Sequence, residues 1–186
     1  KEKAWASPTL FLSQLDGRAH PVYPVPYRQT LKSGAYLRQT EGGTGAMDCR
    51  TYPLGTLDAY TYVVVFSLYE GKLLFSRHKR RGTWETQGGH IEPGETPEVA
   101  FEAAERELFE ESGAVGYELR PAFDYWAGDA AAGAGGRGFV ARIHKIGSLP
   151  ESEIAETALF PRLPENLTYP DITPVLYRKA ARDGWL

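Results

Sequence analysis

Three glutamates near the end of one predicted helix have the residue type and spacing of a metal site. Glu107, Glu110 and Glu111 stand at i, i+3 and i+4 in the segment 97–112, so they share one helix face. Their repulsion costs about a few tenths of a kcal/mol per pair, and the negative end of the helix dipole disfavours Glu110 and Glu111 further. A divalent cation would reverse both penalties, and Mg²⁺ and Mn²⁺ prefer oxygen ligands. The pattern therefore predicts a cation at this face.

An ordinary solvated acidic face is the alternative interpretation of the same helix. Arg106 stands four residues from both Glu102 and Glu110, and ion pairs at that spacing would relieve part of the repulsion. The glycine pair Gly88-Gly89, shortly before the helix, favours the metal site over this alternative.

The helix has clear ends and one apolar face. Thr96 is a favourable N-cap, and Pro97 fits the first helical position. Gly113 is typical of the residue that follows a helix. The apolar face is formed by Val99, Ala100, Ala103, Ala104 and Leu108. We therefore expect one helix over 97–112, with its acidic end at the site.

The segments around this helix predict strands. Residues 61–68 and 72–76 are rich in β-branched and aromatic side chains and flank Glu70-Gly71, which predicts a hairpin. Residues 84–89 are interpreted as a loop with paired glycines. Two more strands, at 117–126 and 139–146, are expected around a glycine- and alanine-rich loop, followed by a last helix at 174–181.

Composition narrows the class of protein. The chain has 186 residues and a net charge of −3, which argues against a general nucleic-acid or membrane-surface binder. Cys49 is the single cysteine, so an intrachain disulfide and a multi-cysteine metal site are excluded. Neither an apolar run near the ~18 residues of a membrane helix nor a signal-peptide pattern is present. The sequence predicts a cytoplasmic protein with no membrane or nucleic-acid partner.

The first 46 residues differ from the rest of the chain. Pro21, Pro24 and Pro26 are spaced too closely for a helix or a central strand. The glycines of residues 42–45 predict a flexible joint just before Met47. We expect an N-terminal extension at 1–46, to which no chemistry is assigned, and a single domain at 47–186.

The glycine pair and the acidic helix together resemble the Nudix box, G-x5-E-x7-R-E-U-x-E-E-x-G-U, in which U is a bulky aliphatic residue. The matching residues are Gly89-His-Ile-Glu-Pro-Gly-Glu95 and Arg106-Glu-Leu-Phe-Glu-Glu-Ser-Gly113. Ten residues separate Glu95 from Arg106 where the pattern has seven, so either Glu95 or Glu98 is its first acid. We place the insertion in the first helical turn, where three residues rotate the helix by ~300° and keep its catalytic face. Gln87 stands where proline commonly precedes the glycine pair.

The resemblance implies a metal-dependent Nudix hydrolase with an α+β fold, an α/β/α sandwich in which a mixed sheet lies between helices. Its implied cofactor is Mg²⁺, with Mn²⁺ as an alternative. Glu107 and Glu111 match the principal metal ligands, and Glu110 a further carboxylate ligand. Gly89 would offer a backbone carbonyl as a metal ligand, and Arg106 would orient the neighbouring glutamates.

The implied substrate is a nucleoside diphosphate linked to another moiety. Segments 84–94 and 163–169 are similar to bacterial members labelled 8-oxo-dGTP diphosphatases, which favours a nucleoside triphosphate such as an oxidised purine nucleotide. Nucleotide sugars, ADP-ribose and dinucleoside polyphosphates stay open.

Glu153 is a candidate general base or additional ligand, and Glu107 is the other candidate base. Arg77, at the end of a strand directed toward the box, is expected to bind a phosphate. Candidate stacking aromatics are Tyr62, Trp84, Phe123 and Tyr125.

Two other classes of function stay open at this point. One is a non-catalytic nucleotide-binding module on the same fold, and the other is a diphosphate isomerase of related fold that would use Cys49. The sequence G-x-G-x-x-G at 133–138 is interpreted as a hairpin loop, because a strand rather than a helix follows it. Oligomeric state, a homodimer included, and the number of metal ions do not follow from the sequence.

Overall fold

Eight strands form one mixed sheet in the part of the chain that a computed structural model describes, residues 9–12, 19–22, 47–91, 97–129 and 131–186. The order is β10-β5-β4-β9-β8-β3, with β6 beside β5 and β7 beside β4. Among these pairs β4 and β9 run parallel, and the others are antiparallel. The strands are β3 (Asp48–Tyr52), β4 (Tyr62–Tyr69), β5 (Lys72–His78), β6 (Trp84–Glu85), β7 (Gln87–His90), β8 (Ala114–Gly128), β9 (Gly133–Ile146) and β10 (Ile154–Phe160).

The predicted hairpin is confirmed as β4 and β5. Leu68 pairs with Leu73 and Tyr69 with Lys72, which leaves Glu70 and Gly71 as the two turn residues. Both have positive φ, 51° and 72°. This is the backbone that joins two strands of right-handed twist through a two-residue turn.

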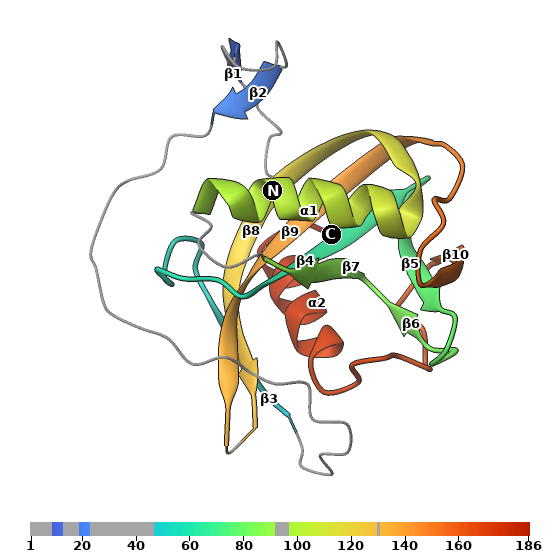
Figure 1. The fold of residues 1–186 in the computed structure, drawn as a ribbon. Helices are drawn as coiled ribbons and strands as arrows, with labels where there is room; N and C mark the ends of the chain where they lie inside the picture. The colour runs from blue at the N-terminus through green and yellow to red at the C-terminus, as the bar shows by residue number, and fades with distance from the viewer. Residues whose placement is uncertain (1–8, 13–18, 23–46, 92–96, 130) are drawn as a thin grey trace.

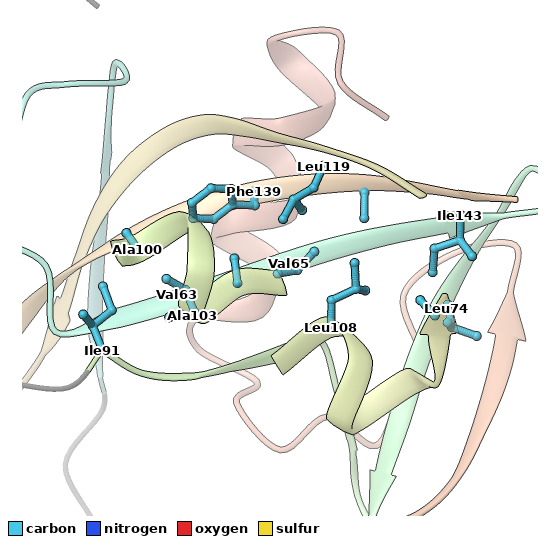
Figure 2. Close-up of a cluster of buried hydrophobic side chains, with 13 residues drawn as sticks. Val63, Val65, Leu74, Ile91, Ala100, Ala103, Leu108, Leu119, Phe139 and Ile143 are labelled. Atoms are coloured by element: carbon cyan, nitrogen blue, oxygen red, sulfur yellow. The ribbon is translucent and has the colours of Figure 1, made fainter. Parts of the chain in front are cut away.

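Helix α1 (Pro97–Ser112) covers one face of the sheet, as the sequence predicts. Its small residues Ala100 and Ala104 are fully buried, which lets the helix lie close to the strands, and Leu108 fills the space beside them. Figure 2 shows this cluster, in which the helix packs on Val63 and Phe139 among others. Gly113, with φ of 71°, ends the helix.

Helix α2 (Thr173–Arg182) covers the opposite face and confirms the predicted last helix. Leu176 and Ala180 are buried in a second cluster with Phe66, Phe123 and Val140. Figure 1 shows the sheet between the two helices, so the predicted α+β class with a mixed sheet is confirmed. Among the described residues, no helix combines the length and apolarity needed to cross a membrane.

Two segments that were predicted as loops from their glycines are strands in the structure. Residues 84–89 form β6 and β7, and a Cβ on Gly88 would overlap the Val63 carbonyl oxygen on the neighbouring strand. Strands β8 and β9 are longer than predicted, and the G-x-G-x-x-G segment is part of β9. Its glycines Gly133 and Gly138 make room for the rings of Trp126 and Phe123. Glycine here marks close approach of neighbouring atoms within a sheet.

The extension contains a small sheet of its own. Strand β1 (Thr9–Leu12) pairs antiparallel with β2 (Ala19–Val22), with Thr9 opposite Val22. Pro21 lies in β2, and a strand at the edge of a sheet is where proline is tolerated. The other residues of the predicted extension lie outside the described part of the chain, apart from these two strands.

Candidate active site

The last turns of α1 lie against β7, and this contact positions two of the predicted glutamates. The Gly88 N–H donates to Glu111 Oε2 at 2.9 Å, and only 5% of Glu111 is exposed. A Cβ on Gly89 would overlap Glu107 Oε1, so the missing side chain leaves the space that the Glu107 carboxylate occupies. Because both residues are glycine, the carboxylates of Glu107 and Glu111 can lie directly against β7.

Arg106 lies between two of the carboxylates. Its Nη1 is 2.8 Å from Glu107 Oε1 and 3.2 Å from Glu110 Oε2. Its Nη2 donates to the His90 carbonyl at the end of β7, at 3.3 Å. The structure therefore brings Arg106, Glu107, Glu110, Glu111 and the glycine pair together.

Glu85 is a further carboxylate of this cluster that sequence reasoning missed. It is 5% exposed, and Arg81 Nη2 lies 2.8 and 3.0 Å from its two oxygens. Its negative charge contributes to the raised pKa of Glu111. The signal that could have found it is strand alternation, because Glu85 follows Trp84 and points to the other face of β6.

Burial and like charge act in the same direction on these acids. Burial, and to a lesser extent the charges of Glu107, Glu85 and Glu153, raise the pKa of Glu111 to about 9 against the opposing effect of the Gly88 N–H. Burial also raises the pKa of Glu107, which Arg106 opposes. A bound cation would stabilise the ionised form of these carboxylates, which burial and mutual repulsion disfavour.

The donor chemistry of the cluster fits a hard divalent cation. Glu85 is held by Arg81, and the other two buried donors, Glu107 and Glu111, are both carboxylates, as Mg²⁺ and Mn²⁺ prefer. Within the described residues no three acidic, histidine or cysteine side chains converge in a group that would hold a metal ion. Glu107 and Glu110 instead contact Arg106. These carboxylates could hold a cation once Glu107 turns from the guanidinium.

Glu153 lies at the edge of the same cluster, next to a buried histidine. His78 Nε2 is 3.3 Å from Glu153 Oε2. His78 Nδ1 accepts from the backbone N–H groups of Arg80 and Arg81, at 3.1 and 3.4 Å, so in the neutral imidazole the proton is on Nε2, the nitrogen near Glu153. The Glu153 charge contributes to the raised pKa of both Glu107 and Glu111.

Arg77 is not brought to the glutamates. Its Nε lies 2.6 Å from Glu156 Oε1 on the neighbouring strand β10, and its Cζ lies 6.0 Å from the centre of the Trp84 ring. Ser76, the preceding residue of β5, bonds to α1, so alternation places Arg77 on the other face. Phosphate binding by Arg77 stays a prediction.

The remaining sequence candidates lie apart from the cluster or outside the described residues. Phe123 and Tyr125 are core residues. The Tyr62 ring contacts the His90 ring at a tilted angle, with the two centres 4.4 Å apart, and Trp84 packs edge-on against Phe160. A hollow of about 400 Å³ opens beside Trp84, lined also by Phe160 and residues 161–166. Cys49 lies on the edge strand β3, where burial raises the pKa of its thiol to about 11. Glu95 and the side chain of Glu98 lie outside the described residues.

Comparison with known proteins yields one family and several solved structures of similar fold. The model of the NUDIX domain matches residues 60–161, whereas no curated protein matches the chain. Among solved structures, a mutant of the Bacillus subtilis pyrophosphohydrolase BsRppH is 26% identical, with a TM-score of 0.61 over 75% of this chain and 92% of that one. A UDP-X diphosphatase is 20% identical, with a TM-score of 0.53 over 70% of this chain and 66% of that one. The NUDIX domain of Shewanella oneidensis NrtR, complexed with ADP ribose, is 16% identical, with a TM-score of 0.50 over 70% and 92%.

Proposed function

Because the chain belongs to the NUDIX family of pyrophosphohydrolases, we propose that it hydrolyses the phosphoanhydride bond of a nucleoside diphosphate linked to another moiety, with Mg²⁺ or Mn²⁺ as cofactor. The observation that carries the proposal is the 2.9 Å hydrogen bond from Gly88 to Glu111, which sets a buried carboxylate among three others. A nucleoside triphosphate, such as an oxidised purine nucleotide, is the substrate we favour. The 26% identity to a pyrophosphohydrolase supports the class of reaction.

Glu107, Glu110 and Glu111 are the side chains that would hold the cation, together with the Gly89 carbonyl. A bound divalent cation neutralises the diphosphate, positions its bridge and acidifies a water molecule. Arg106 balances the charge of Glu107 and Glu110 and orients them from the His90 end of β7. Glu85 stays paired with Arg81, so it adds negative charge without being free to turn.

We propose Glu153 as the residue that takes the proton of the attacking water. Its side chain is 64% exposed, so it can contact water and release the proton again, and His78 Nε2 lies 3.3 Å from its Oε2. Proton transfer by a positioned carboxylate contributes about 10²-fold or more to such reactions. Glu107 is the alternative base, although its contact with Arg106 favours a ligand role.

Replacing Glu153 by glutamine tests this role. We expect Glu153→Gln to lower kcat by about 10²-fold, because the amide cannot accept the proton, with KM and melting temperature nearly unchanged since the side chain is exposed. Glu151→Gln, an exposed acid two residues away, is the matched control and should leave kcat unchanged. Wild-type kcat in Glu153→Gln would return the role to Glu107.

The proposed function itself is tested by phosphate and pyrophosphate release from a nucleotide panel. The panel holds dGTP, 8-oxo-dGTP, ADP-ribose, a UDP-sugar and a dinucleoside tetraphosphate, each with Mg²⁺, Mn²⁺ or chelator. We expect a nucleoside triphosphate to release phosphate or pyrophosphate with Mg²⁺ or Mn²⁺, and we expect the chelator to abolish this release. Folded, metal-binding protein that releases nothing from any member would contradict catalysis and favour a nucleotide-binding module.

A further inference from the structure

Gln87 begins β7, and its side chain is buried completely between the sheet and α1. Its Nε2 lies 2.7 Å from Ser76 Oγ on β5, and 3.5 Å from the Leu74 carbonyl. Ser76 is buried as completely, and its hydroxyl donates to the main-chain carbonyl of Glu111 at 2.7 Å. A chain of hydrogen bonds therefore runs from Gln87 through Ser76 to Glu111.

The direction of this chain follows from its proton count. The Ser76 hydroxyl has one proton, which goes to the Glu111 carbonyl, so the group at its lone pairs must be a donor. The Gln87 amide nitrogen supplies that donor. Neither a methionine nor a proline side chain at position 87 could do so, and proline is what the Nudix pattern commonly has there.

The chain of bonds ends on the same residue that Gly88 holds. The Glu111 carbonyl is one of the last four of α1, which lack a partner within the helix. Ser76 holds this carbonyl, while the Gly88 N–H holds the carboxylate of the same residue. Two consecutive residues of β7 thus act on Glu111, Gly88 directly at its side chain and Gln87 through Ser76 at its main chain.

Stability alone does not account for an amide at position 87. Gln87 Oε1 is buried and has no hydrogen-bond partner within the described part of the chain, which costs stability. Methionine has a similar length and would avoid that cost. What the amide adds is the donor toward Ser76.

We propose that Gln87 and Ser76 are positioning residues for the cation site, which hold the last turn of α1 so that the Glu111 carboxylate stays fixed at Gly88. The inference rests on the proposed function, in which Glu111 is a metal ligand. Residues that hold a ligand in this way commonly contribute about 10-fold to 100-fold to metal affinity or activity.

The test uses Gln87→Met, Ser76→Ala and the double variant in the full chain. The readouts are the Mn²⁺ dissociation constant without substrate, kcat with excess Mg²⁺, and the melting temperature of metal-free protein. We expect each single variant to weaken Mn²⁺ binding and lower kcat by about 10-fold. The double variant should have the same Mn²⁺ affinity and kcat as the more impaired of the two single variants. Gln87→Met should melt no lower than wild type, which a purely structural role does not predict.

Ser67→Ala is the matched control. Ser67 Oγ is as buried as Ser76 Oγ, and it has no hydrogen-bond partner among the described residues. This variant should leave Mn²⁺ binding and kcat unchanged. Unchanged Mn²⁺ binding in both Gln87→Met and Ser76→Ala, or additive losses in the double variant, would overturn the inference. If Glu111→Gln binds Mn²⁺ like wild type, the proposed function fails instead.

Discussion

We expect Glu111→Gln to lower kcat for metal-dependent hydrolysis by about 10³-fold or more, and at the same time to make the metal-free protein more stable. The loss of activity follows because a neutral amide is a poor ligand for Mg²⁺, and the cation contributes several kcal/mol to the transition state, at about 1.4 kcal/mol per tenfold in rate. The gain in stability follows because glutamine does not have to take up a proton when it is buried, as the glutamate does, and it still accepts the Gly88 hydrogen bond.

The stability difference depends on pH in a defined direction. The pKa of Glu111 is about 9 in the folded protein and near 4.5 when unfolded, so the folded state holds a proton that the unfolded state releases. The stabilisation from this group is complete below pH ~4.5 and is lost as pH rises to about 9. Glutamine does not titrate. Its advantage over glutamate in chelator therefore grows between these values and exceeds about 1.4 kcal/mol, the equivalent of one pKa unit, at pH 8.5.

Urea unfolding in chelator at pH 5.5 and 8.5, with and without added Mg²⁺, measures this difference. Glu102→Gln, an exposed glutamate of the same helix, is the control and should alter neither kcat nor stability. With saturating Mg²⁺ the order should reverse, because ligand binding stabilises only the protein that binds it. Equal stability of Glu111→Gln and wild type at both pH values would show that folding does not raise the pKa of Glu111.

Helix α1 and the β4–β5 hairpin were predictable because their signals are local. Pro97 and Gly113 mark the two ends of the helix, and Glu70-Gly71 supplies the turn that two neighbouring strands need. Strand β7 was not predictable in this way. Glycine pairs are typical of turns, so its sequence predicts a loop. The reason for glycine within this strand is the close approach of β4, which the sequence does not show.

The carboxylates of the site also differ in whether a local sequence signal predicts them. Glu107, Glu110 and Glu111 follow from helical spacing, whereas Glu85 is near enough to raise the pKa of Glu111 only because β6 pairs with β5 in the folded sheet. Arg77 shows the converse. Its position at a strand end suggested the site, but the alternation of β5 turns it to Glu156 on the other face. A single residue of register decides which face a strand side chain reaches, and that register is set by tertiary pairing.

The glycine pair offers the second large effect, because its two members have different neighbours. Gly88→Ala should destabilise the protein by about 1–3 kcal/mol or more, since its Cβ would meet the Val63 backbone, which cannot move without moving β4. Gly89→Ala should cost little stability, because its Cβ meets the flexible end of the Glu107 side chain. Neither change strains the backbone, as neither glycine has positive φ.

The expected effect on activity is the reverse of the effect on stability. Gly89→Ala displaces the Glu107 carboxylate, so we expect kcat to fall by about 10²-fold to 10³-fold, a loss of the size produced by removing a preorganised charged group from an active site. The Mn²⁺ dissociation constant should rise with it, whereas the melting temperature of metal-free protein stays near that of wild type. Gly88→Ala that still folds at low temperature should keep more activity than Gly89→Ala. Full activity and unchanged Mn²⁺ binding in Gly89→Ala would remove Glu107 from the metal site, because the space it needs would have been filled without consequence.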